Sequence, residues 1–254
     1  MTVYNVTFSP TGGTKKVADI LAGELGGNIV DVELCVPEKK LNIPELTEDD
    51  ICIISVPSFG GRVPQIAADR IGKFKANGAK AVLVCVYGNR AYEDTLTELK
   101  DTAEKAGFKC FAAVAALAEH SITRDIAKGR PDSRDEAVLK EFAGKIKEKM
   151  QADDFNLCTQ IPGNATYKER GKVKSVPEAG DACVKCGACA KICPAEAIDF
   201  ENPNVTDGEK CVTCMKCIKV CPKNARAINS ERYAAILEML GKVAADRKES
   251  QLYI

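Results

Sequence analysis

Eight regularly spaced cysteines dominate the chemistry that this 254-residue sequence could support. They lie within residues 183–221 and form two runs of the pattern C-x2-C-x2-C-x3-C-P, and the second run repeats the first 28 positions later. This spacing is typical of the ligands of a cubane 4Fe-4S cluster, and in two-cluster ferredoxins the fourth cysteine of each run ligates the other cluster. The runs therefore predict two ligand sets, Cys183, Cys186, Cys189 and Cys221 in one, and Cys211, Cys214, Cys217 and Cys193 in the other.

Structural zinc is the competing interpretation of these cysteines, because paired Cys-x-x-Cys elements also form zinc ribbons. Zinc takes four ligands and gives no reason for the third cysteine or for the Cys-Pro ending, both of which occur twice. The spacing thus favours iron and sulfide. A unit of about fifty residues that shares crossed ligands is too small to depend on an apolar core, so we expect metal to be a part of its fold.

The overall composition excludes several classes of protein. The chain has 36 basic and 36 acidic side chains, which argues against nucleic-acid binding, and no apolar run approaches the roughly 18 residues of a membrane span. The amino end alternates like a β-strand and lacks the regions of a signal peptide, so we expect a cytoplasmic protein. In that reducing compartment, 13 cysteines indicate metal rather than disulfides.

A second candidate site is the loop of residues 9–14, Ser-Pro-Thr-Gly-Gly-Thr, between the first predicted strand and the first predicted helix. Its glycines let a ligand approach the backbone, a helix amino terminus offers free N–H groups, and three hydroxyls can donate hydrogen bonds. The loop has neither the Walker A order nor the G-x-G-x-x-G spacing. We interpret it as a phosphate cradle, although such a turn is often only a connection between a strand and a helix.

The elements that position this loop alternate between apolar β-branched runs and amphipathic helical patterns. Strands are expected at 3–8, 28–34, 51–56, 79–87 and 108–117, and helical patterns cover 17–25, 67–74, 96–106 and 139–150. A capping box, Ser133-x-x-Glu136, precedes the last helix, and residues 36–50 contain two prolines and little helical pattern. The alternation predicts an α/β fold with a doubly wound, five-stranded parallel sheet. Ligands of such sheets bind at the carboxyl ends of the strands, where two further loops carry glycines and aromatic residues.

These loops resemble those of the flavodoxins, in which S/T-x-T-G-x-T binds the phosphate of FMN and the next two loops enclose the isoalloxazine ring. Nearly the whole chain resembles the flavodoxin-ferredoxin fusion proteins of anaerobic bacteria and archaea, including the stretches 86–92, 120–121, 129–132 and 162–164. The resemblance implies a flavodoxin-like domain followed by a small α+β bacterial-type ferredoxin domain with two 4Fe-4S clusters. The implied FMN-binding residues are Ser9, Thr11, Gly12, Gly13 and Thr14 at the phosphate, and Pro57, Phe59, Gly60, Gly61, Tyr87, Gly88, Asn89 and Tyr92 around the ring.

The resemblance also suggests how the chain is divided. We expect a flavodoxin-like FMN-binding domain at 1–152, a linker at 153–180, the ferredoxin domain at 181–230 and a C-terminal helix at 231–254. His120 is a weak candidate for a proton carrier or a donor to flavin, since a lone histidine is more often structural. Of the remaining cysteines, Cys158 is a candidate reactive thiol, and the others are expected to be buried: Cys35, Cys52, Cys85 and Cys110.

Two redox functions fit this architecture. The first is an electron-transfer flavoprotein that passes electrons between FMN and the clusters, and so connects one-electron and two-electron partners such as a ferredoxin or a reductase. The second is an FMN-dependent reductase of a small organic acceptor, such as a quinone or an unsaturated acid, so whether the protein is an enzyme stays open. A third class, a zinc-bound interaction protein on a flavin-free scaffold, is the non-redox alternative. A homodimer is compatible with the sequence.

Overall fold

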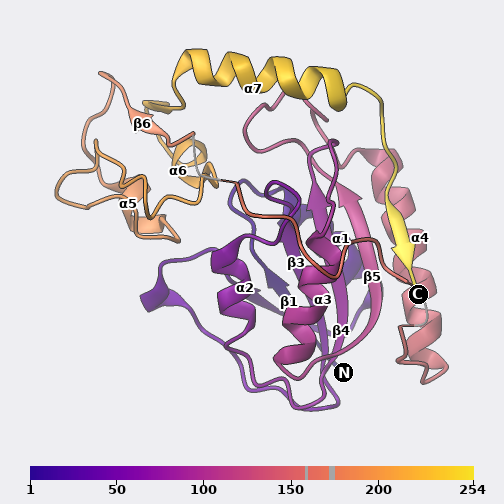
Figure 1. Cartoon of the computed structure of the whole chain (residues 1–254). Helices are drawn as coiled ribbons and strands as arrows, with labels where there is room; N and C mark the ends of the chain where they lie inside the picture. Colours follow the sequence, from indigo (N-terminus) through magenta and orange to yellow (C-terminus); the bar gives the residue numbers. More distant parts are fainter. Residues whose placement is uncertain (158–159, 172–174) are drawn as a thin grey trace.

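The computed structural model describes residues 1–157, 160–171 and 175–254, and its largest element is a parallel sheet (Figure 1). The five parallel strands are β1 (Thr2–Thr7), β2 (Asn28–Glu33), β3 (Ile51–Pro57), β4 (Lys80–Tyr87) and β5 (Lys109–Leu117). Their order in the sheet is β2-β1-β3-β4-β5. This is the flavodoxin-like order of doubly wound folds, so the predicted fold class and all five predicted strands are confirmed.

Four helices cover the two faces of this sheet. They are α1 (Gly13–Leu25), α2 (Gln65–Ile71), α3 (Thr95–Lys105) and α4 (Ser133–Gln151). Helices α1 and α4 pack against one face through apolar residues such as Leu21 and Leu139, while α2 and α3 pack against the other face through residues such as Ile71 and Leu99. The connection after β2 contains only a short 3-10 helix, η1 (Glu38–Lys40), as its two prolines predicted.

The capping box of α4 lies one residue earlier than predicted. Asp132, not Ser133, is the N-cap, and its carboxylate accepts hydrogen bonds from the amides of Arg134 and Asp135. The Asp135 carboxylate accepts in return from the Asp132 amide, at 2.9 Å. Aspartate caps a helix as well as serine does, and the second carboxylate is also buried against Arg130, which favours this register.

The segment expected to be a linker lies along α3 in its described part. The Asp94 carboxylate accepts hydrogen bonds from the amides of Asn164, at 2.9 Å, and Lys168, at 2.8 Å. The Arg170 guanidinium pairs with Glu98 of α3. The segment is therefore fixed to the first domain by ordered polar contacts.

The cysteine-rich region is built from short elements. They are β6 (Glu178–Ala179), α5 (Ala188–Ile192), α6 (Lys216–Lys219) and β7 (Arg226–Ala227), and β6 pairs with β7 in antiparallel fashion. The 28-residue repeat is visible in the backbone: three pairs of residues have the same positive φ to within 5°, namely Lys185 and Thr213, Gly187 and Met215, and Glu196 and Asn224. The two halves thus have the same local fold.

The C-terminal segment corrects the expectation of a single helix over residues 231–254. Helix α7 (Ser230–Val243) ends well before the C-terminus, and the chain then returns to the first domain as β8 (Gln251–Tyr253) (Figure 1). Strand β8 pairs antiparallel with β5 and makes the sheet six-stranded. Its side chains alternate: Leu252 packs against one face of the sheet and Tyr253 against the other. Among the described residues, no helix is long and apolar enough to cross a membrane.

Candidate functional site

The eight cysteines of the repeat line two separate hollows. Cys183, Cys186, Cys189 and Cys221 surround one hollow of about 320 Å³, and Cys193, Cys211, Cys214 and Cys217 surround another of about 340 Å³. The structure therefore brings together the same two sets that the crossed-ligand rule predicts. We call the first the outer hollow, because Cys186 is exposed and Cys183 and Cys221 are partly exposed, and the second the inner hollow, because all four of its cysteines are buried.

Backbone amides point at the sulfur atoms of both hollows. The amide of Ala197 donates to Cys193 Sγ at 3.4 Å, and the amide of Ala225, its counterpart in the repeat, donates to Cys221 Sγ at 3.2 Å. The amide of Thr213 also donates to Cys211 Sγ at 3.4 Å. Hydrogen bonds to sulfur stabilise thiolates and are one of the means by which proteins adjust iron–sulfur potentials.

The donor set suits an iron–sulfur cube better than one zinc ion. In the part of the chain that the structure describes, no three histidine, cysteine, aspartate or glutamate side chains converge closely enough to hold a single metal ion. Zinc would require four sulfur atoms about 2.3 Å from one point. Burial also raises the pKa of the Cys217 thiol to about 11, so its thiolate needs a positive partner, which either metal would supply.

The inner hollow lies against the first domain. Arg70 of α2 donates to the carbonyl of Pro194 at 2.9 Å, and Pro194 lines the inner hollow. In the opposite direction, Lys216 of α6 reaches Glu33 at 3.0 Å and the carbonyl of Cys35, both beyond or at the end of β2. These contacts place the inner cysteines at the carboxyl edge of the parallel sheet.

A third hollow, of about 570 Å³, lies at that same edge. Its lining comes from all four central strand ends: Thr11, Gly13, Thr14, Pro57, Ser58, Phe59, Gly60, Val86, Tyr87, Gly88, Arg90, Ala91, Ala118, Glu119, His120 and Ser121. One end is the amino terminus of α1, whose N-cap Gly12 has no side chain to occupy it, and the other end has aromatic residues. The residues present therefore fit a ligand with an anionic tail and a flat ring, such as FMN.

Glycines in two loops shape this hollow. Gly60 and Gly61 both have positive φ and form the centre of a tight turn between Phe59 and Arg62, whose backbones exchange hydrogen bonds. At Gly88, a Cβ atom would lie only 2.4 Å from the ring of His120, so only glycine leaves room for that ring.

Five of the residues predicted to bind FMN do not line the hollow. The Ser9 hydroxyl accepts a hydrogen bond from the Lys15 amide and so caps α1, and Gly12 provides the left-handed turn before that helix. Gly61 is packed against the side chain of Glu93. The side chains of Asn89 and Tyr92 are directed toward the C-terminal segment instead.

Comparison with known proteins identifies the cysteine-rich region. The model of the 4Fe-4S dicluster domain family matches residues 182–225. We call residues 182–225, which are similar to this family, the dicluster domain. The dicluster domain and the flavodoxin-like sheet before it together give the chain the make-up of a flavodoxin-ferredoxin fusion protein.

Solved structures similar to the first domain include several flavodoxins. A Streptococcus pneumoniae TIGR4 flavodoxin is 17% identical with a TM-score of 0.41, covering 59% of this chain and 99% of its own. An archaeal flavodoxin is 12% identical with a TM-score of 0.39, covering 59% and 99%. The two-electron reduced flavodoxin of Megasphaera elsdenii is 17% identical with a TM-score of 0.35, covering 57% and 99%. A search of curated proteins found no match. The strand order, rather than these scores, establishes the flavodoxin-like fold.

The C-terminal segment after the dicluster domain is held by Asn89 and by a network of charges. The buried Asn89 amide donates to the carbonyls of Ala244, at 2.7 Å, and Asp246, at 2.8 Å, and its oxygen accepts from the Lys248 amide at 3.2 Å. Tyr92 donates to Gln251 at 2.7 Å. The loop after β4, which was predicted to enclose a flavin ring, thus also binds residues 244–253, which we call the C-terminal strap.

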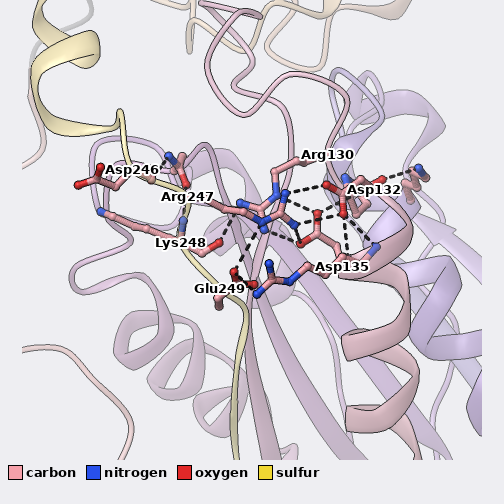
Figure 2. Close-up of polar contacts among 11 residues, drawn as sticks. Arg130, Asp132, Asp135, Asp246, Arg247, Lys248 and Glu249 are labelled. Atoms are coloured by element: carbon pink, nitrogen blue, oxygen red, sulfur yellow. Dashed lines mark hydrogen bonds and ion pairs between the residues drawn. The ribbon is translucent and has the colours of Figure 1, made fainter.

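Figure 2 shows the charged part of this attachment. Arg130 forms a bidentate pair with Asp135, and both side chains are buried. Arg247 of the strap contacts Asp132, at 2.7 Å, and Asp135, at 3.1 Å. Arg130 also donates to the carbonyl of Lys248 at 2.9 Å. The strap is therefore joined to the start of α4 as well as to the loop after β4.

His120 has one fixed tautomer. Its Nδ1 accepts from the backbone amides of Ile122, at 3.3 Å, and Thr123, at 3.1 Å, so the proton of the neutral ring is on Nε2. Burial and the charge of Arg90 lower the pKa of His120 to about 4. The neutral ring therefore presents its Nε2–H at the wall of the third hollow.

The remaining cysteines of the flavodoxin-like domain are buried, as predicted: Cys35, Cys52, Cys85 and Cys110. Burial raises the pKa of Cys35 and of Cys110 to about 12, so these thiols stay protonated. Cys158, the predicted reactive thiol, lies outside the described residues.

Proposed function

We propose that this protein is an electron-transfer iron–sulfur flavoprotein that passes electrons between FMN and two 4Fe-4S clusters. The observation that supports it most is the arrangement of three hollows: two lined by four cysteines each, with the inner one against the sheet edge that bears the third. FMN exchanges two electrons singly and a cluster exchanges one, so the combination would connect one-electron with two-electron partners.

In this proposal the residues of the third hollow hold FMN. The phosphate would lie at the amino terminus of α1, within reach of Thr11, Gly13 and Thr14, where the free N–H groups and the helix dipole favour an anion. The ring would lie between the loops after β3 and β4, with Phe59 and Tyr87 as its aromatic neighbours. The Nε2–H of His120 is available as a donor toward it.

The dicluster domain supplies two sites with different access. The outer cysteines are reachable from solvent, whereas the inner cysteines are covered by the contacts of Arg70 and Lys216. Glu119, which lines the third hollow, is also influenced by the dicluster domain. Burial opposes ionisation of Glu119, but the Gly129 amide, Arg124 and the charge of Lys219 of α6 together lower its pKa. A redox partner protein, such as a ferredoxin or a reductase of the cytoplasm, would then meet the outer site.

A reductive titration of the anaerobically purified full chain tests this function. Flavin and iron–sulfur absorption should both bleach, with about four electrons taken up per chain, two by flavin and one by each cluster. Rapid mixing with a one-electron protein acceptor should then reoxidise flavin and clusters together. Absence of either chromophore, or flavin that is reoxidised by no protein acceptor, would contradict the proposal.

One observation favours the alternative function, an FMN-dependent reductase of a small organic acceptor. An open hollow of about 890 Å³ adjoins the third one, shares Tyr87 and Arg90 with it, and is also lined by Tyr92 and Lys248. Quinones and unsaturated acids are the acceptors to test. Fast turnover with one of them and none with protein acceptors would establish the reductase instead.

A further inference from the structure

Arg226 of β7 is a buried cation without a carboxylate partner. Its side chain is 3% exposed, and none of the described residues forms an ion pair with it. The other two buried arginines of the described chain both have an acidic partner: Arg70 pairs with Glu38 and Arg130 with Asp135. A buried charge with no opposite charge is costly, so a counter-charge is expected at Arg226.

The neighbours of Arg226 accept hydrogen bonds from its guanidinium, but they are neutral. Its Nη1 donates to the carbonyl of Pro203 at 2.6 Å, and its Nη2 donates to the carbonyl of Pro177 at 2.9 Å and to the Thr206 hydroxyl. Its Nε is buried and has no hydrogen-bond partner. These neutral acceptors fix the guanidinium in one orientation and leave its positive charge uncompensated.

The guanidinium lines the outer hollow, and it is also within hydrogen-bond reach of Cys217 of the inner set. In the outer set, its Nη1 lies 3.7 Å from the Sγ of Cys189. A 4Fe-4S cube with four thiolates is an anion, and each added electron makes it more negative. The cluster proposed for this hollow would therefore supply the missing counter-charge.

The internal repeat provides a built-in comparison. The position 28 residues before Arg226 is Ile198, which is buried and lines the inner hollow. The outer hollow thus has a fixed positive charge where the inner hollow has an aliphatic side chain. Nearby positive charge favours the reduced, more negative form of a cluster.

We propose that Arg226 separates the reduction potentials of the two cluster sites by raising that of the outer site above that of the inner site. The inference depends on the proposed function, because it requires clusters in both hollows. The outer site would then be the better electron acceptor of the two, and it is also the site that a partner protein can reach.

The test is a redox titration of the full-length holoprotein, followed by EPR, with the cysteine Hβ NMR signals used to assign each site. Arg226→Ile, which copies the inner half of the repeat, should lower the electron affinity of the outer site at least tenfold, or about 59 mV for one electron. The inner site should change less. Arg226→Lys, which keeps the charge, should remain close to the wild type, and Arg232→Gln, at an exposed arginine, should have no effect.

Each result either supports or overturns the proposed role of Arg226. An unchanged outer potential in Arg226→Ile, or an equal shift in Arg226→Lys, would overturn the proposal. If Arg226→Ile binds no iron, then Arg226→Lys with full loading and a wild-type potential supports the role of charge, while loss of loading in both variants shows a merely structural role and overturns it. A wild-type protein without clusters would refute the proposed function itself, before any variant is compared.

Discussion

The flavodoxin-like domain buries apolar side chains on both faces of its sheet, whereas the dicluster domain buries few side chains besides its own cysteines. Its two small apolar clusters contain Cys189 with Cys217 and Cys193 with Cys211, each with one further buried residue. The first domain can fold by burial of apolar surface alone. The second has the size and the core of a unit that depends on bound metal.

Buried cations differ between the two regions in the same way. Arg130 of the first domain is neutralised by Asp135, a carboxylate of the protein, while Arg226 of the second has no carboxylate partner in the described chain. One region is therefore electrostatically complete as a polypeptide. The other would be completed by the anionic cluster that we propose for its outer hollow.

Removal of iron should have the largest effect and should separate the two regions. After chelation under reducing conditions, we expect residues 181–229 to lose all protection from hydrogen exchange, because little apolar core remains, while β1 and β3 to β5 stay protected. Cys214→Ser should lose part of the protection of residues 181–229. Cys85→Ser, at a buried cysteine outside both hollows, should bind a full complement of iron. Equal loss of protection in both regions would show that the dicluster domain does not depend on iron more than the flavodoxin-like domain does.

Breaking the buried pair of the first domain should cost about 3–5 kcal/mol of unfolding free energy, as for other buried ion pairs that lose one partner. Arg130→Met leaves the buried Asp135 with Arg247 as its ion-pair partner among the described residues, and urea denaturation measures the loss. The control is Arg134→Met, because the Arg134–Glu249 pair is exposed and worth about 0–1 kcal/mol. Similar losses in the two variants would show that burial of the pair does not matter.

His120 should make the flavodoxin-like domain less stable in mild acid. Its pKa is about 4 in the folded protein and about 6.5 when unfolded, so the unfolded chain binds more protons between these values. Its contribution is complete above pH 6.5 and is lost as the pH falls toward 4, up to about 3 kcal/mol. The melting temperatures of the wild type and of His120→Gln, compared across this pH range, should diverge as the pH rises. Parallel curves would show that protonation of His120 does not destabilise the domain.

Weakening the attachment of the C-terminal strap should have the smallest effect on stability, and the effect should be confined to the strap. Asn89→Ala removes three hydrogen bonds to residues 244–248 and should cost about 1–3 kcal/mol. Hydrogen exchange of residues 244–254 should accelerate, while the iron content stays the same. Unchanged exchange would mean that the charged contacts of Arg247 hold the strap without Asn89.

The sequence predicts best where the cause is local. The strands β3, β4 and β5 are apolar runs because both faces of the sheet are covered there, and the cysteine spacing predicts the two sets that line the hollows. The roles of Asn89 and Tyr92 could not be predicted, because their partners belong to the strap, about 160 positions away, and β8 has only three residues. Docking of the dicluster domain depends on single polar residues such as Arg70 and Lys216, which no pattern distinguishes.

The content of iron, acid-labile sulfide and flavin in the anaerobically purified full chain tests most directly whether the protein carries both clusters and FMN. Two 4Fe-4S clusters and one FMN predict about eight iron atoms, eight sulfides and one flavin per chain. Stoichiometric zinc in place of iron, or iron and sulfide without flavin, would contradict the account.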